Sequence, residues 1–265
     1  MNEIEMLVSA LNAPEKEARL AALCKLRQRL DSGEIPRPTV GDDVNNHIHT
    51  TYSFSPYSPA MAVWRAYNAG LMTAGLMDHD SIGGADEFIE AGKILGIMTT
   101  VGIECRVKMN DTPLNGKRIN NPDQRSVAYI ALHGIPHQNI ARVREFFIPF
   151  TAARIVRNRK MTDRINAITA KFNIALDFDR DIIPISMAHD SGSITERHIL
   201  FALANKIIER FGKGGRVVGF LRDDMGIGLS AKAEAYLTDA GNMMYEYDLL
   251  GVLKSDLVES FYIDA

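Results

Sequence analysis

The chain has 265 residues, of which 46% are hydrophobic and 24% charged, and these proportions exclude a disordered or low-complexity polypeptide. The formal net charge of −3 predicts no duplex DNA partner and no anionic membrane partner. Two cysteines, Cys24 and Cys105, exclude a disulfide scaffold and favour a reducing, cytoplasmic location. The sequence contains no apolar stretch of about 18 residues, so no membrane span is predicted. The acidic start of the chain does not resemble a signal peptide.

Residues 1 to about 33 have a helical pattern. The segment Asn12-Ala13-Pro14-Glu15 has the form of an N-cap, an early proline and a capping glutamate. Leucines then recur at helical spacing, at Leu20, Leu23, Leu26 and Leu30. Gly33 suits the helix end, and two prolines follow at Pro36 and Pro38. We therefore expect a helical extension over residues 1–40, whose apolar stripe is packing surface rather than a partner site, and a second domain over 41–265.

From about residue 44, short apolar runs alternate with helical segments. Strands are expected over 44–51, 71–78, 97–105 and 126–132, and helices over 58–70 and 81–95. Ser58 has the character of an N-cap with Pro59 at the first helical position, and Gly96 suits the end of the second helix. This alternation predicts βαβ units around a parallel sheet or barrel, in which functional residues gather at the carboxyl ends of the strands.

The second half of the chain is predominantly helical. A helix is expected over 138–172 with an interruption near Pro149, and another over 193–211 opened by a Ser193–Glu196 capping box. The glycines of 212–215 indicate a turn that opens no helix. The first helix is basic, which suits either a solvated face or a cationic rim for an anionic substrate. Its basic residues are Arg142, Arg144, Arg154, Arg157, Arg159, Lys160 and Arg164.

The histidines carry the chemical signal. His47 and His49 end a predicted strand, and side chains two apart in a strand share a face. Two imidazoles placed in this way can converge on one metal ion or on two adjacent ions. Asp78-His79-Asp80, Glu104 and His133 end the following predicted strands. Because strand ends meet at one edge of an α/β scaffold, this series predicts a polynuclear metal site in which a glutamate can bridge two cations.

The ordered motifs resemble the PHP (polymerase and histidinol phosphatase) superfamily. They are His47-Ile48-His49 followed by Thr50–Ser53 and Tyr57-Ser58-Pro59, then Gly75–Ser81, then Gly102-Ile103-Glu104. The resemblance covers about residues 44–135 and implies a distorted (β/α)7-type barrel, incomplete at its C-terminus, with two or three divalent ions (Mn, Zn or Fe). It further implies that His47 and His49 bind a first metal, that Glu104 bridges to a second held also by His133, and that His79 serves a third position.

The chain departs from the family pattern at several positions. Asn46 stands where the family often has Asp, and Phe54 and Ser55 stand where it usually has Asp or His. Neither an Ala-His-Pro-like turn nor a C-terminal Asp-x-His motif is clearly present, although Ala188-His189-Asp190 partly imitates the former. The last residues, 261–265, have the pattern of a strand beginning a further unit. The expectation is therefore either a fragment of a longer protein or a short member with an incomplete site.

Other residues receive secondary roles. Asp78 is expected to orient a ligand histidine, and Arg197 and His198 are candidates for substrate contact because Thr195–Ile199 resembles a family segment. His198, at the third position of a helix, can instead act as a cap. Solvent exposure is expected for His137, a loop or structural role for His189, and buried packing for Cys105.

These residues predict a metal-dependent hydrolase of phosphate esters, with His47, His49 and Glu104 at the centre of the chemistry. The substrate is expected to be a small phosphorylated compound or a nucleotide, not duplex DNA. Two alternatives remain open. One is an amidohydrolase that uses the same metal chemistry, and the other is a degenerate PHP domain that binds or stabilises without turnover.

Overall fold

The computed structural model describes residues 2–121 and 124–263. The chain forms two compact units, one from 1–151 with 187–193 and the other from 152–186 with 194–265. Residue 40 is therefore not a boundary between these units. One of the three boundaries between them lies inside helix α5 (Ile140–Thr169), which contributes to both.

The first unit is built on a sheet of four strands within the described residues, in the order β1-β2-β3-β4. They are β1 (Val44–Ile48), β2 (Thr73–His79), β3 (Met98–Lys108) and β4 (Val127–Leu132). The first three strands are parallel and are connected by α3 (Pro59–Asn68) and α4 (Ala85–Leu95). The expected α/β class and βαβ units are thus confirmed, whereas closure into a seven-stranded barrel stays a prediction.

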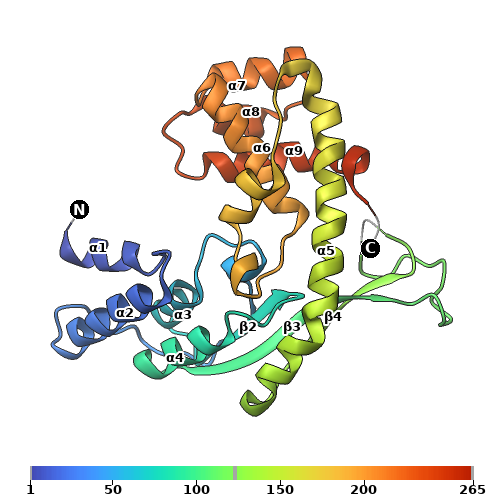
Figure 1. Cartoon of the computed structure of the whole chain (residues 1–265). Helices are drawn as coiled ribbons and strands as arrows, with labels where there is room; N and C mark the ends of the chain where they lie inside the picture. Colours follow the sequence, from blue (N-terminus) through green and yellow to red (C-terminus); the bar gives the residue numbers. More distant parts are fainter. Residues whose placement is uncertain (1, 122–123, 264–265) are drawn as a thin grey trace. The chain divides into compact units, whose positions relative to one another are not determined.

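The fourth strand runs against the expected direction. β4 is antiparallel to β3, with Glu104 paired to Ala131 and Lys108 to Val127, so the parallel arrangement predicted for this strand is wrong. No crossover helix joins the two strands in the described residues; they form a hairpin (Figure 1). Parallel strands need a crossover connection of a dozen or more residues, usually helical, and the turn-rich segment after Lys108 does not form one.

Local signals position the two crossover helices. Ser58 is the N-cap of α3 and accepts a hydrogen bond from the Met61 N–H, while Gly96 ends α4 with a φ of 77°. Both termini agree with the sequence prediction. Positive φ carries little penalty for glycine, which explains the stop at Gly96. Buried residues of α3 and α4, including Val63 and Phe88, form the core with strand residues such as Leu76.

The N-terminal extension packs on this core. Helices α1 (Glu3–Ala10) and α2 (Lys16–Asp31) bury Leu23, Leu26 and Leu30, which confirms the expected packing role of the leucine stripe. Asn12 does not cap α2 as predicted. Its side chain instead accepts from the Ser58 N–H at 2.9 Å and donates to the Pro56 carbonyl, tying the extension to the start of α3.

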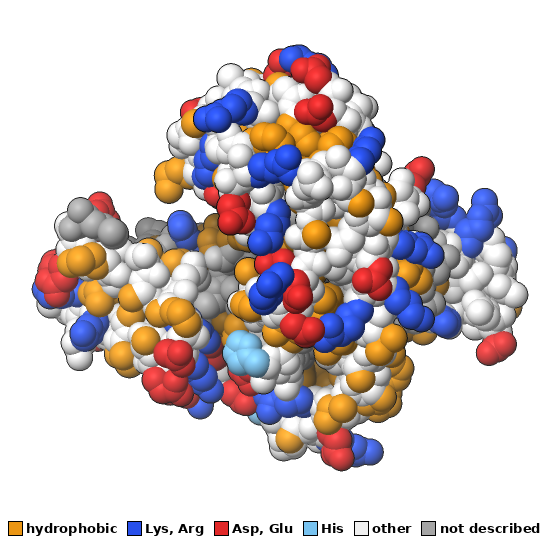
Figure 2. Space-filling model, turned by 45° about the horizontal axis from the view of Figure 1, so that its top comes forward, with side chains coloured by type: hydrophobic (Ala, Val, Ile, Leu, Met, Phe, Trp, Pro, Cys, Tyr) orange, Lys and Arg blue, Asp and Glu red, His pale blue; other side chains and the backbone are white. Residues whose placement is uncertain are grey.

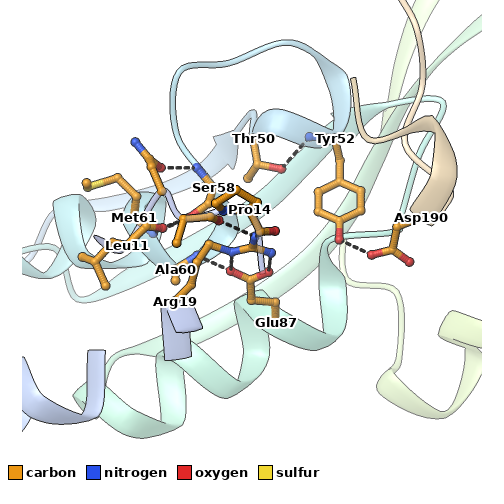
Figure 3. A network of polar contacts seen from close by, with 12 residues as sticks. Leu11, Pro14, Arg19, Thr50, Tyr52, Ser58, Ala60, Met61, Glu87 and Asp190 are labelled. Atoms are coloured by element: carbon orange, nitrogen blue, oxygen red, sulfur yellow. Dashed lines mark hydrogen bonds and ion pairs between the residues drawn. The ribbon is translucent and has the colours of Figure 1, made fainter. Parts of the chain in front are cut away.

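A buried ion pair attaches α2 to α4. The Arg19 guanidinium binds both oxygens of Glu87, at 2.8 Å and 2.5 Å, and also donates to the Ala13 and Pro14 carbonyls (Figure 3). Glu87 in turn accepts from the Ala60 N–H. Both charged side chains are at most 4% exposed. Because each buried charge has its partner and additional hydrogen bonds, the pair fixes the extension on the sheet's helical layer.

The regular elements of the second unit are all helices within its described residues. Helix α5, which the two units share, is continuous through Pro149 in the first unit, so the predicted interruption is wrong. The second unit also contains α6 (Glu196–Phe211), α7 (Gly215–Gly219), α8 (Ala231–Thr238) and α9 (Tyr245–Phe261). Two predictions are corrected here, because Gly215 opens the short α7 and Phe261 ends a helix instead of beginning a strand. Residues 264–265 lie outside the described residues.

The N-cap of α6 also differs from the prediction. The cap is Thr195, not Ser193, and the ring of His198 completes the capping box by accepting from the Thr195 N–H at 3.0 Å. Ser193 donates its backbone N–H to the Tyr52 carbonyl at 2.8 Å instead. This long-range bond holds Ser193 outside the helix, which explains the shift of the start by two residues.

The basic side chains of α5 have mixed environments. Arg144 pairs with Asp86 at 3.0 Å and Arg159 with Asp179 at 2.6 Å, both near the surface. Arg154 is buried, and burial together with the charge of Arg157 lowers its pKa to about 10. The solvated-face interpretation therefore holds for part of this set only. Among the described helices, none combines the length and apolarity needed to cross a bilayer.

Candidate metal centre

Strand β1 and the residue after it present two imidazoles together. His47 and His49 are two residues apart in extended backbone, and their ring centroids are 5.0 Å apart. The Nε2 atoms of the two rings lie 3.5 Å and 3.6 Å from the same Glu104 Oε2. The expected convergence of this His-x-His pair on one point is therefore present in the structure.

Strands β2 and β3 bring a third histidine to the same carboxylate. His79 and Glu104 are directly paired across the parallel strands, although 25 positions separate them in the sequence. The Nδ1 atom of His79 lies 3.1 Å from Glu104 Oε2, and its ring stacks on that of His49 with centroids 4.5 Å apart. Three imidazoles thus surround one carboxylate that is only 16% exposed.

His133 reaches the cluster from the antiparallel strand. β4 runs back along β3, with Leu132 paired to Ile103, and the chain continues beside Val101 through a bond from the Ile135 N–H. The His133 ring centroid is 6.4 Å from that of His47, and the side chain is exposed. The five predicted ligands therefore lie in one neighbourhood. The four histidines lie at or just beyond strand ends, whereas Glu104 lies inside β3, so the prediction that Glu104 ends its strand is wrong.

The donor set fits a divalent cation. Ligand atoms of His47, His49 and Glu104 all lie within 4.8 Å of one another, as they must to share an ion. Imidazole nitrogen with carboxylate oxygen suits Zn, Mn or Fe. His79 also lies against Glu104, and the His133 ring adjoins that of His47.

Asp78 holds the backbone beside the ligands. It is fully buried, and Thr50 donates both its backbone N–H and its hydroxyl to the carboxylate, each at 2.6 Å. Ser53 donates a further hydrogen bond at 2.6 Å. Burial raises the pKa of Asp78 to about 6, while these hydrogen bonds act in the opposite direction. Asp78 thus fixes the loop that follows His49, and its predicted role in orienting a ligand histidine stays a prediction.

Two of the departures from the pattern of the PHP superfamily, Asn46 and Phe54, have distinct structural consequences. Asn46 Oδ1 accepts from the hydroxyls of Thr73 and Thr100, both at 3.2 Å, and so connects β1 with β2 and β3. Phe54 follows the short turn Thr51–Ser53 with a φ of 77°, a conformation that bulky residues rarely adopt. Its hydrocarbon ring offers no ligand atom.

Several residues near the centre were not singled out for a role in the sequence analysis. Thr50 and Ser53 bind Asp78, and Tyr129 lies with its ring centroid 6.0 Å from that of His79. The Arg106 guanidinium lies 5.4 Å from the centroid of the Tyr129 ring. Alternation along the strands from Glu104 and from Ala131 could have placed Arg106 and Tyr129 on one face, but only after the antiparallel register was known.

The remaining candidates belong to other segments of the chain. Arg197 and His198 belong to the second unit, where Arg197 is exposed and His198 is buried at the start of α6. Burial lowers the pKa of His198 to about 4, so the ring is neutral near pH 7 and acts as a cap. His137 is exposed, as expected, and His189 is an exposed residue of the short turn Ala188–Asp190. Cys105 is half-buried.

Sequence comparison gives a local relationship. No protein-family model matches the chain. A 5′-3′ exoribonuclease of Haemophilus influenzae is 43% identical over 58 residues, which are 22% of this chain and 21% of that protein. The chain thus matches about a fifth of the length of this curated relative.

Solved structures are similar to larger parts of the chain. One is a proposed metal-dependent phosphoesterase of Bifidobacterium adolescentis, with a TM-score of 0.49 and 23% identity over 74% of this chain and 57% of the other. Another is an amidohydrolase of Chromobacterium violaceum with bound sulfate and no metal, with a TM-score of 0.46 and 19% identity over 76% and 64% of the two chains. Likeness at this level assigns no activity to the present chain.

Proposed function

We propose that the chain is a metal-dependent hydrolase of phosphate esters. The observation that carries this proposal is the geometry around Glu104, whose one oxygen lies between 3.1 Å and 3.6 Å from nitrogens of His47, His49 and His79. Such a concentration of donors is typical of a site that holds cations. The relative named an exoribonuclease supports a phosphodiester as the bond that is cleaved.

The roles of the residues follow from their positions. His47, His49 and Glu104 would hold the divalent ion, with His79 and His133 available for a further one. When bound, such ions polarise a phosphoryl oxygen and generate a hydroxide nucleophile near neutral pH. Asp78 keeps Thr50 and the loop after His49 in place. Arg106, held against Tyr129 near His79, supplies positive charge toward the phosphate.

The test is hydrolysis by protein purified without chelator, together with elemental analysis. Bis(p-nitrophenyl) phosphate, a 5′-phosphorylated single-stranded oligoribonucleotide and an amide panel form the substrate set. We expect phosphoester cleavage that chelation abolishes. Cleavage of the amides alone would instead establish the amidohydrolase alternative, and metal binding without any turnover would establish the binding module.

A variant pair tests the site itself. Glu104→Gln keeps the shape but removes the charge that the cations need, and we expect kcat/KM to fall at least about a hundredfold. Glu90→Gln, an exposed change on α4, should leave kcat/KM unchanged and serves as the control. Activity of Glu104→Gln within about twofold of the wild type would refute the assignment of Glu104.

A further inference from the structure

The β3–β4 hairpin carries a concentration of positive charge on a chain that is acidic overall. Between Arg106 and Tyr129 the sequence contains five basic residues against two aspartates, whereas the whole chain has a net charge of −3. The described residues of this hairpin segment are here called the arm. Its basic residues are Arg106, Lys108, Lys117, Arg118 and Arg125. In Figure 2 lysine and arginine side chains gather over the lobe that β3 and β4 form.

The arm begins on the face of the sheet that carries the metal centre. Side chains alternate along a strand, so Glu104, Arg106 and Lys108 share one face of β3 at about 6.5–7 Å intervals. Contacts confirm the first step, because Glu104 touches His79, His79 adjoins Tyr129, and the Arg106 guanidinium lies over the Tyr129 ring. A row of cationic groups therefore leads outward from the candidate metal centre.

The outer part of the arm places like charges opposite each other. Arg118 and Arg125 form an antiparallel bridge, and both side chains are exposed. Directly opposed like charges destabilise a strand pair. Arg125 also donates from its guanidinium to the Gly116 carbonyl at 3.1 Å. Lys108 and Lys117 are also exposed, and within the described residues neither forms an ion pair. This part of the arm is suited to a polyanion.

Hydrogen bonds make the arm an ordered surface. The Asn120 side chain accepts from the Tyr129 N–H at 2.9 Å and donates to the Tyr129 carbonyl at 2.8 Å, which pairs the outer edge of β4. Ser126 donates its N–H to the Lys117 carbonyl at 2.9 Å. The segment with Lys117 and Arg118 is therefore held alongside the strand, so a ligand meets cations that are already in position.

We propose that the arm binds the sugar-phosphate backbone of a single-stranded nucleic acid whose reacting phosphodiester lies at the His47–His49–Glu104 centre. The inference rests on the proposed function and specifies its substrate class. A single strand is favoured because the cations begin with Arg106 and Lys108 on β3 and continue in the connection to β4, with Lys117, Arg118 and Arg125. Cationic tracks of this kind bind single strands without base readout. Vesicles with anionic lipid and duplex nucleic acid serve as the competing ligands in the test.

The experiment compares two charge reversals of equal size. Lys117→Glu/Arg118→Glu changes the arm, and Lys25→Glu/Lys232→Glu changes exposed lysines outside it. Fluorescence anisotropy with a labelled 12-nucleotide RNA at several salt concentrations gives Kd. We expect the arm variant to raise Kd at least about tenfold and to reduce the salt slope by about 1.4, which corresponds to two phosphate contacts. The control variant should stay within about twofold.

Hydrolysis of bis(p-nitrophenyl) phosphate separates the arm from the metal centre. This ester is too small to reach Lys117, so its kcat/KM should be unchanged in the arm variant, while KM for the RNA rises. An equal loss of RNA affinity in both variants, unchanged affinity in the arm variant, or no RNA binding by the wild type would overturn the proposal. Equally tight arm-dependent binding of duplex or of phosphatidylserine vesicles would also overturn it. If RNA binding depends on the arm but neither bis(p-nitrophenyl) phosphate nor the RNA is cleaved, the hydrolase proposal fails. The proposal that the arm binds single-stranded nucleic acid is then retained.

Discussion

The buried histidine of the second unit should make stability depend on pH. His198 is 1% exposed, its Nδ1 accepts from the Thr195 N–H, and burial lowers its pKa from 6.5 to about 4. Arg154 acts in the same direction, and Glu196 opposes it. In the unfolded chain the ring takes up a proton as pH falls below its ordinary pKa, whereas the folded protein resists protonation. The contribution to stability is therefore complete above about pH 6.5 and is lost as pH falls toward about 4.

The magnitude follows from the two pKa values. Near pH 5 the unfolded ring is almost fully protonated and the folded ring almost fully neutral, which lowers the free energy of unfolding by about 2 kcal/mol relative to pH 7. Urea denaturation of the wild type and of His198→Gln measures this effect. Glutamine is a usual partner in a capping box, so it can still accept from Thr195 but does not titrate.

The difference between these two proteins isolates His198, because all other titrating groups are common to both. We expect the wild type to lose about 2 kcal/mol more than His198→Gln between about pH 7 and pH 5. His189→Gln, which changes an exposed ring, should follow the wild type. Parallel pH profiles for wild type and His198→Gln would refute the argument that the buried ring is held neutral.

Two further predictions concern the first unit. His47→Ala/His49→Ala removes two of the three converging donors, so elemental analysis should show loss of bound divalent metal. The melting temperature of this variant should no longer rise when Mn²⁺ is added. Full metal content in the variant would contradict the site. Glu87→Gln leaves the Arg19 charge buried without its partner and should lower the free energy of unfolding by about 3–5 kcal/mol in urea titrations. Glu90→Gln on the same helix is its control, and a loss below about 1 kcal/mol for Glu87→Gln would show that the pair is not structurally important.

Much of the local order was predictable because its causes are local. Ser58 and Pro59 start α3, and a glycine with positive φ ends α4, as expected from capping chemistry. The start of α6 was mispredicted because Ser193 is bound by the distant Tyr52 carbonyl. Asn12 was mispredicted for the same kind of reason, since Ser58 and Pro56 take its hydrogen bonds. A local sequence pattern does not show that a residue far along the chain will take these hydrogen bonds.

The candidate metal centre also has features that local sequence predicts and features that depend on distant segments. The period of two along a strand is a local property, so the shared face of His47 and His49 could be predicted from the residues alone. The distance between His79 and Glu104 depends on the parallel register of β2 and β3, and the positions of Tyr129 and Arg106 depend on the antiparallel turn of β4. Strand direction and register are decided by hydrogen bonds between segments far apart in the chain. Tertiary structure alone therefore decided the distances around the carboxylate and which cations continue outward from it.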